Sequence, residues 1–186
     1  MAEPGRRRPA VFLDRDGTLI EDPGFVADPV HVKLIPGAAQ AVRRLNQAGL
    51  PAVLVTNQSG IARGLITLPQ YEAVEARLIK LLAGGGARLD GAYYCPHHSD
   101  FTGPCDCRKP GTKLFRDAAA AQNLDLGRSF YVGDRMSDIE PARALAGRGI
   151  LVRTGQGAEH APAAIDAGFT VTADLQTAVD LILEQS

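Results

Sequence analysis

The sequence contains 186 residues, of which 45% are hydrophobic and 22% are charged, with 20 Lys and Arg against 21 Asp and Glu. This length suits a single domain with its own core, and the composition is that of a globular protein rather than a disordered one. The formal net charge of −1 argues against binding to nucleic acid or an anionic membrane through a broad basic surface. No apolar run reaches the ~18 residues of a membrane span.

The N-terminal arginines at residues 6–8 precede an apolar stretch that ends at Asp14. That stretch is too short for a secretion signal, so we predict a flexible, solvated tail over residues 1–8 and a cytoplasmic location. The three cysteines all lie within residues 95–107. An odd number of cysteines makes a poor disulfide framework and suits a metal cluster better, in keeping with a reducing compartment.

Short apolar runs alternate with segments of helical periodicity along the chain. The expected strands are residues 10–13, 52–55, 92–94, 130–132, 150–152 and 170–171. The expected helices cover residues 38–48, 67–82, 114–119, a segment capped by 137–140, and 175–182. Continuously apolar strands that alternate with helices predict a doubly wound, Rossmann-like parallel sheet of the α/β class. With no repeat or linker, residues 1–186 form one domain, whose ligand site is expected beyond the carboxyl ends of the strands.

Helix-boundary signals accompany these segments. Thr67 and Gln70 have the spacing of a capping box, and Ser137 and Glu140 repeat it. Gly49 is expected to end the first long helix. Glycines at 84–86 are expected to end the second helix.

Polar motifs directly follow the predicted strands. The first strand ends in Asp14-Arg-Asp16-Gly17-Thr18, in which two carboxylates can face the crevice; an ordinary Asp- and Gly-rich turn is the alternative. The second strand ends in Thr56-Asn-Gln-Ser-Gly60, whose hydroxyl, amide and backbone N–H groups suit a phosphate oxygen, or simply cap a loop. Lys109 precedes the third helix, where a solvated surface lysine is the alternative. Asp134 and Asp138 follow the fourth strand, where a helix cap is the alternative.

The order of these four motifs resembles the haloacid-dehalogenase superfamily of phosphohydrolases over residues 11–138. This resemblance implies that Asp14 is the nucleophile and that Asp16 is the general acid and base. It also implies that Thr56 and Lys109 hold the phosphoryl oxygens. Asp134 would bind Mg²⁺ together with Asp14 and the backbone carbonyl of Asp16, and Asp138 would support the metal site from nearby.

A second metal set lies before the third helix, as Cys95-Pro-His97-His98 followed by Cys105-Asp-Cys107. Three thiolates and one imidazole make a tetrahedral zinc set, which predicts a structural zinc ion in a loop over residues 95–107. His97 is preferred over His98 because it follows Cys95 with the same one-residue gap that separates Cys105 from Cys107. Reduced unliganded thiols, or a strained Cys105–Cys107 disulfide, are the alternative.

The cysteine-containing segment, with Asp-Arg-Asp-Gly-Thr and Thr-Asn-Gln-Ser-Gly-Ile-Ala-Arg-Gly, is similar to one family within that superfamily. These are the D-glycero-D-manno-heptose-1,7-bisphosphate 7-phosphatases of lipopolysaccharide core biosynthesis, whose relatives include histidinol-phosphate phosphatases. The resemblance implies a sugar phosphate as substrate. Two departures concern the substrate side: Gly111-Thr-Lys-Leu replaces the usual Pro-Gly-Met segment, and Arg135 stands where Lys often occurs.

The spacing between motifs leaves room for a minimal cap only, so loops are expected to select the substrate. Arg63, Arg108 and Arg135 are candidates for a second anionic group, because a guanidinium binds phosphate in a fork. The expected substrate-binding residues are Asp22, Phe25, Asn57, Gln58, Ser59, Arg63, Arg108 and Arg135.

Three other functions are alternatives to this reading of the motifs. Histidinol-phosphate hydrolysis needs the same catalytic residues with a different pocket. A DNA 3′-phosphatase shares two motifs, but the balanced charge argues against it, since phosphate backbones are bound by clustered Lys and Arg. A zinc-stabilised binding module would not need the four residues Asp14, Asp16, Lys109 and Asp134. We expect a monomer that binds neither nucleic acid nor membranes.

Overall fold

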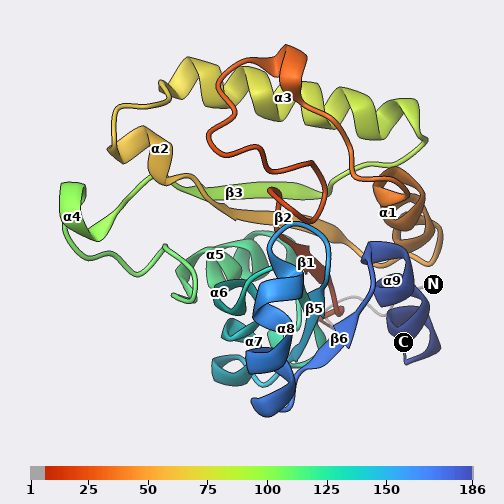
Figure 1. Ribbon diagram of the computed structural model, residues 1–186. Coiled ribbons are helices and arrows are strands. Elements are labelled where there is room, and N and C mark those ends of the chain that lie inside the picture. Colours follow the sequence, from red (N-terminus) through yellow and green to blue (C-terminus); the bar gives the residue numbers. More distant parts are fainter. Residues whose placement is uncertain (1–6, 186) are drawn as a thin grey trace.

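The computed structural model describes residues 7–185, within which six parallel strands form one sheet (Figure 1). The strand order is β3-β2-β1-β4-β5-β6. The strands are β1 (Val11–Leu13), β2 (Ala52–Asn57), β3 (Gly91–Cys95), β4 (Phe130–Gly133), β5 (Arg148–Val152) and β6 (Thr170–Thr172). Each predicted strand is confirmed to within two residues, and the parallel α/β class is confirmed with them.

All the described helices except the last lie between successive strands. In chain order they are η1 (Pro29–His31), α1 (Ala38–Gln47), α2 (Ser59–Ala62), α3 (Leu68–Gly84), α4 (Ser99–Thr102), α5 (Lys113–Gln122), η2 (Leu126–Arg128), α6 (Met136–Ile139), α7 (Pro141–Ala144), α8 (Gly157–Asp166) and α9 (Leu175–Glu184). Within the described residues, no helix is both long and apolar enough to span a bilayer.

Both faces of the sheet are buried, which explains why its strands read as continuous apolar runs. Val11 and Leu13 of β1 belong to a cluster with residues of α1, α3 and α9. Phe12, between them, points to the opposite face and joins a cluster with residues of α5 and the α7 region. Helices α6 and α8 pack on β5 through a smaller cluster. The two layers are visible in Figure 1, with α1 and α9 together and α5 to α8 grouped across the sheet.

The strand order reverses at the centre of the sheet. β1 pairs with β2 on one side and with β4 on the other. Chain connections leave the sheet in opposite directions from such a point and open a crevice beyond the carboxyl ends of the strands. Asp14 directly follows β1 and Asp134 directly follows β4, so the fold brings these two carboxylates to the crevice.

The predicted cap of α3 is confirmed, and that of α6 is wrong. Thr67 and Gln70 form a capping box in which each side chain reaches the backbone of the other residue. Helix α6 already begins at Met136, so Ser137 does not cap it. Instead, the Asp138 carboxylate accepts a hydrogen bond from the backbone N–H of Arg135.

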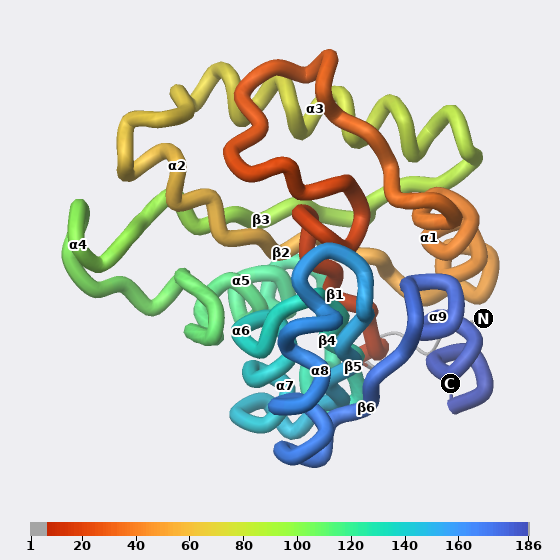
Figure 2. Tube along the Cα trace, viewed as in Figure 1, coloured from red at the N-terminus to blue at the C-terminus, as the bar shows by residue number. Residues whose placement is uncertain are grey.

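The two long excursions from the sheet both lie at the crevice end. Residues 14–37, between β1 and α1, extend past β2 towards α3, as Figure 2 shows. The segment from β3 to α5 carries α4, which projects beside α2. At the other end, Arg8 exchanges backbone hydrogen bonds with Asn123 and Asp125, so it is attached to the domain. Residues 1–6 of the predicted tail lie outside the described residues.

Candidate active site

Lys109 joins two of the predicted carboxylates in the crevice. Its Nζ lies 2.7 Å from Asp14 Oδ1 and 2.8 Å from Asp138 Oδ1, and it also donates to the backbone carbonyl of Val55. All three charged side chains are at least nine-tenths buried. The two carboxylates raise the pKa of Lys109 above its usual value, against the opposing effect of burial. The ammonium group therefore stays charged and offsets the repulsion between Asp14 and Asp138.

Asn57 holds the backbone of Lys109 in place. Its Oδ1 accepts from the Lys109 N–H at 2.9 Å, and its Nδ2 donates to the Lys109 carbonyl at 3.2 Å. Both ends of the amide are thus used on the backbone of one residue, in the loop that follows the cysteine cluster. Asn57 lies at the cleft as expected, but these contacts orient Lys109 rather than leave the amide free for substrate.

Asp134 is completely buried, and only one of its two carboxylate oxygens has a hydrogen-bond partner in the described part of the chain. Its Oδ2 accepts from the Gln156 N–H at 2.8 Å, whereas Oδ1 has no hydrogen-bond partner within residues 7–185. Burial, followed by the nearby charge of Asp14, raises the pKa of Asp134 to about 7. A buried carboxylate oxygen without a donor is costly unless a cation or proton reaches it.

Asp14, Asp134 and Asp138 offer oxygen atoms that all lie within 4.8 Å of one another. Buried carboxylates are the ligands that Mg²⁺ prefers in proteins, and the unpartnered oxygen of Asp134 is the atom that a cation would satisfy. The residues present therefore fit a divalent cation. Burial raises the pKa of Asp138 as well, although Lys109 opposes this.

Asp16 lies two residues beyond Asp14, in a separate hydrogen-bond network. It accepts from both Nε and Nη2 of Arg15, at 3.0 to 3.2 Å, and from Gln58 Nε2 at 2.8 Å. Burial raises the pKa of Asp16, assisted by the charge of Asp14 and opposed by Arg15. This direction suits a residue that must hold a proton before it donates one.

Arg15 was not predicted as a site residue, although it stands between the two motif aspartates. Its side chain is only 2% exposed and lies at the cleft wall with Asp16 and Gln58. Arg15 lies two residues beyond the end of β1, where the residue type alone gives no sign of whether the side chain is buried or solvated. Gln156, whose N–H binds Asp134, was also missed, because a backbone donor leaves no signature in the residue type.

A cleft of about 430 Å³ opens over these groups. Its walls include Asp14, Asp16, Lys109 and Asp138, together with every expected substrate-binding residue: Asp22, Phe25, Asn57, Gln58, Ser59, Arg63, Arg108 and Arg135. Thr56 is buried beneath this surface, with its hydroxyl accepting from Gln58 Nε2 at 2.9 Å. The aromatic ring of Phe25 rests against Gly60, where a Cβ atom would come within 2.8 Å of the ring.

The three candidate arginines are each fixed differently. Arg135 forms an ion pair of 3.0 Å with Asp22, which joins the loops after β4 and β1 across the cleft. Arg63 contacts His98 Nε2 at 2.8 Å and lies over the ring of Phe101 in α4. Arg108 donates to the backbone carbonyl of His97. Two of the three therefore depend on the segment that carries the cysteine cluster.

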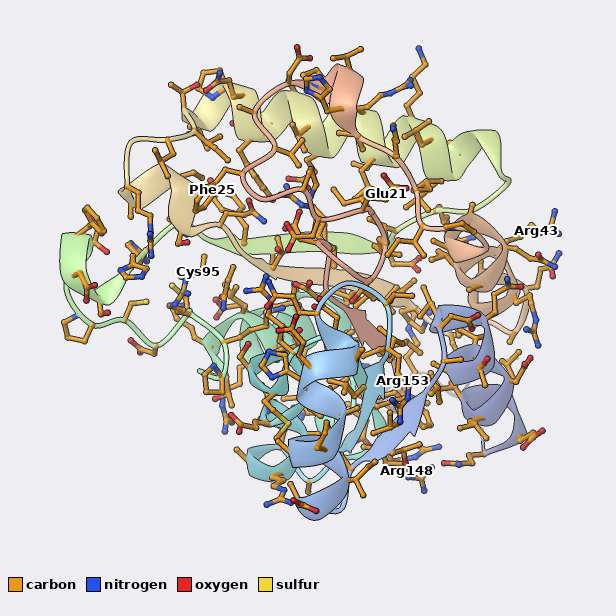
Figure 3. The ribbon with its side chains drawn as sticks, in the orientation of Figure 1. Glu21, Phe25, Arg43, Cys95, Arg148 and Arg153 are labelled. Atoms are coloured by element: carbon orange, nitrogen blue, oxygen red, sulfur yellow. The ribbon has the colours of Figure 1, made fainter. Side chains whose placement is uncertain are left out.

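Cys95, His97, Cys105 and Cys107 converge at the end of β3, where Figure 3 labels Cys95. Their ligand atoms lie within 4.8 Å of one another, and His97 presents Nδ1 at 3.1 Å from Cys107 Sγ. Cys105 and Cys107 are free thiols, so the alternative disulfide is not formed. His98 instead contacts Arg63, as expected if His97 is the ligand. Four soft and borderline donors in this arrangement fit tetrahedral zinc.

Two family models match the chain. Residues 11–67 match a model described as haloacid dehalogenase-like hydrolase, and residues 106–178 match one described as HAD-hydrolase-like. The first match covers the segment of Asp14, Asp16 and Thr56. The second covers Lys109, Asp134 and Asp138.

Similar proteins carry a more specific name. A D-glycero-beta-D-manno-heptose-1,7-bisphosphate 7-phosphatase of Escherichia coli O6:H1 is 43% identical over 80% of this chain and 81% of its own length. A D-glycero-D-manno-heptose-1,7-bisphosphate 7-phosphatase of Thermosynechococcus vestitus is 46% identical, with 81% of each chain covered. A crystal structure of the D,D-heptose 1,7-bisphosphate phosphatase from B. bronchiseptica, with magnesium and phosphate, is 34% identical. It superposes with a TM-score of 0.87 over 96% of this chain and 99% of that chain.

Proposed function

Because the chain belongs to the haloacid-dehalogenase-like hydrolases and is a phosphoric monoester hydrolase, we propose that it removes the 7-phosphate of D-glycero-D-manno-heptose 1,7-bisphosphate. This reaction would serve the assembly of the lipopolysaccharide core heptose. The names of the similar proteins support this substrate.

One observation carries the proposal: Lys109 Nζ lies within 2.8 Å of both Asp14 and Asp138, and these two carboxylates cluster with Asp134, which has an oxygen that is unpartnered among the described residues. A nucleophilic carboxylate must approach an anionic phosphoryl group, and two unit charges 4 Å apart repel by about 4 kcal/mol at an effective dielectric constant of 20. The buried ammonium group offsets this repulsion on the protein side. When bound by Asp14, Asp134 and the Asp16 carbonyl, Mg²⁺ would add positive charge that stabilises the phosphoryl oxygens.

Asp14 and Asp16 divide the chemical steps between them. Asp14 attacks phosphorus and forms an aspartyl-phosphate while the bond to the sugar oxygen breaks. Asp16 donates its proton to that departing oxygen, and then takes a proton from the water that cleaves the aspartyl-phosphate. The raised pKa of Asp16 supports the first of these roles. Thr56 and Lys109 hold the phosphoryl oxygens.

The arginines at the mouth of the cleft would bind the second phosphate of the substrate. Arg63, Arg108 and Arg135 line the same cleft as the catalytic carboxylates, and a guanidinium matches a phosphate in a fork. Such a set favours a bisphosphate over a substrate with one phosphate. Asp22 and Phe25 face the same space and would contact the sugar.

A zinc ion held by Cys95, His97, Cys105 and Cys107 would be structural, since the four residues leave no coordination position open. Its role would be to order the loop that leads into Arg108 and Lys109. We further propose that the protein acts as a cytoplasmic monomer, without nucleic-acid or membrane partners. The balanced charge of the sequence supports the absence of nucleic-acid and membrane partners.

A substrate panel tests the proposed function. Heptose 1,7-bisphosphate, histidinol phosphate and a 3′-phosphorylated DNA duplex would be compared at equal concentration, with Mg²⁺ and with chelator, and products would be followed by phosphorus NMR. We expect Mg²⁺-dependent loss of the 7-phosphate with the 1-phosphate retained. Preference for histidinol phosphate or for DNA, or loss of the 1-phosphate first, would contradict the proposal.

A further inference from the structure

We propose that Arg15 and Gln58 are positioning residues that orient two catalytic groups at once, the carboxyl group of Asp16 and the hydroxyl group of Thr56. The inference rests on the proposed function, because it assumes that Asp16 transfers a proton and that Thr56 contacts the phosphoryl group. It adds a role for Arg15, and it assigns Gln58 to orientation rather than to substrate binding.

Arg15 grips Asp16 through two nitrogens. Nε lies 3.2 and 3.1 Å from the two carboxyl oxygens, and Nη2 lies 3.0 Å from Oδ1. The guanidinium is itself held, because its Cζ lies 5.6 Å from the ring centroid of Tyr71, which packs on Tyr94 at 4.3 Å. The planar guanidinium therefore fixes the direction of the Asp16 carboxyl group. The ammonium group of a lysine, which has no such plane, would not fix it.

Gln58 connects Arg15, Asp16 and Thr56 through one amide. Its Oε1 accepts from Arg15 Nη2 at 2.9 Å, which fixes which end of the amide is the oxygen. Its Nε2 then has two protons, and lies 2.8 Å from Asp16 Oδ2 and 2.9 Å from Thr56 Oγ1. Each donor of the amide is matched to one acceptor, so the amide has a single consistent orientation.

This orientation decides how Thr56 can be used. Because Thr56 Oγ1 accepts from Gln58, the hydroxyl proton of Thr56 remains available for another acceptor. A phosphoryl oxygen is such an acceptor. The same amide thus keeps the Thr56 hydroxyl as a donor and holds Asp16 at the cleft wall. Preorganised donors and acids of this kind act without reorganisation during the reaction.

The test compares two substrates whose leaving groups differ in basicity. An alkyl phosphate such as the sugar bisphosphate needs proton donation to its leaving oxygen, whereas p-nitrophenyl phosphate releases a stable phenolate and does not. We expect Arg15→Lys to lower kcat/KM for the sugar bisphosphate about 100-fold, within the range of general acid catalysis. For p-nitrophenyl phosphate the loss should be several-fold smaller. Equal losses on the two substrates would indicate a general structural defect and would overturn the proposal.

A double variant separates positioning from direct action. If Arg15 acts through Asp16, then Arg15→Lys should cause little further loss in an Asp16→Asn background. Additive losses would overturn the proposal. Arg44→Lys, at a surface ion pair with Asp180, is the matched control and should retain wild-type kinetics.

Gln58→Met tests the same proposal if Arg15→Lys does not fold, because this substitution removes the amide group and changes the side-chain shape little. We expect a lower kcat for the sugar bisphosphate with KM changed less than threefold; a raised KM at unchanged kcat would mean that Gln58 binds substrate instead. The Asp16→Asn variant distinguishes failure of the premise. Wild-type hydrolysis of the sugar bisphosphate by Asp16→Asn would refute the acid role of Asp16, and with it the positioning proposal, while the proposed substrate would stand.

Discussion

Gly17 lies directly against the carboxylate of Asp134. A Cβ atom built on Gly17 would fall 2.2 Å from Asp134 Oδ2, and the backbone of Gly17 has a positive φ of 83°. Gly155 lies beside Gly17, and a Cβ atom built on Gly155 would fall 2.3 Å from the same oxygen. The turn after β1 therefore leaves room for the buried carboxylate that follows β4, and this contact connects the first motif to the fourth.

Gly17→Ala should displace Asp134 and lower both stability and magnesium-dependent activity. Gly49→Ala is the matched control, since Gly49 also has a positive φ, of 74°, but would contact nothing within 4 Å. We expect Gly49→Ala to cost about 1 kcal/mol of unfolding free energy through backbone strain alone, with full activity. Gly17→Ala should cost about 2 kcal/mol more, as overpacking of a buried site does. Urea denaturation and the Mg²⁺ dependence of the rate measure both effects.

Lys109→Met should abolish turnover and destabilise the protein most at high pH. Removal of the ammonium group leaves Asp14 and Asp138 buried beside each other without compensation, which typically costs about 3–5 kcal/mol. Protonation of either carboxyl group relieves the repulsion, so the variant should regain stability as the pH falls. Thermal melting between pH 5 and pH 8 in the presence of chelator would show this.

The control for Lys109→Met is the double variant Lys109→Met/Asp138→Asn. It removes one of the two like charges, and we expect it to be more stable than Lys109→Met alone at pH 8. A double variant that is less stable than both single variants would contradict the assignment of Lys109 as the shared counter-ion of Asp14 and Asp138.

Asp134 should make the metal-free protein less stable as pH rises. Its folded-state pKa of about 7 is raised above the ordinary value of 3.8. The folded state therefore binds the proton more tightly, and this contribution is complete below about pH 4 and lost as pH rises through 7. The loss by pH 8 amounts to about 4 kcal/mol, at about 1.4 kcal/mol per pKa unit.

The check is to measure urea midpoints with chelator at several pH values for the wild type and Asp134→Asn. The wild type should lose more stability between pH 5 and pH 8 than Asp134→Asn does, and Mg²⁺ should restore most of it in the wild type only. Parallel stability curves for the two proteins would contradict this account of Asp134.

Cys107→Ser should lose zinc, and His98→Ala should retain it. Cys107 Sγ lies 2.9 Å from Cys95 Sγ and 3.1 Å from His97 Nδ1, whereas His98 contacts Arg63. If loss of the structural metal lowers the free energy of unfolding by about 3 kcal/mol, the melting temperature of a chain of this size should fall by about 10 °C. Zinc content by atomic spectroscopy, with melting curves, separates the outcomes. Zinc loss from His98→Ala with retention in a His97→Ala variant would reverse the ligand assignment.

The sheet was predictable because its strands are buried on both faces. Each strand therefore consists of an uninterrupted run of apolar residues. Helix α8 was not predicted, because Pro162 lies inside it and an internal proline ordinarily argues against a helix. The N-cap of α6 was placed two residues late, at Ser137 instead of Arg135, because Ser is the stronger N-cap by residue type. The helix instead begins after Arg135, whose backbone N–H donates a hydrogen bond to the Asp138 carboxylate.

The gathering of Asp14, Lys109 and Asp134 was predictable, because each belongs to a polar motif that follows a strand or precedes a helix. Arg15 was missed because an arginine between two motif aspartates offers no pattern that separates a buried partner from a solvated neighbour. The shared amide of Gln58 depends on the meeting of two loops in space. Sequence spacing cannot show such a meeting, and Gln58 was therefore expected only as a substrate contact.

The central claim is that Asp14 carries the phosphoryl group during turnover, and trapping that group tests it most directly. Asp16→Asn should slow cleavage of the intermediate, so rapid acid quenching after mixing with p-nitrophenyl phosphate and Mg²⁺ should leave one phosphoryl group on the peptide that contains Asp14. Mass spectrometry would locate it, and Asp14→Asn should neither become labelled nor turn over. A protein that stays unlabelled, or an Asp14→Asn variant that hydrolyses the substrate at the wild-type rate, would contradict the account.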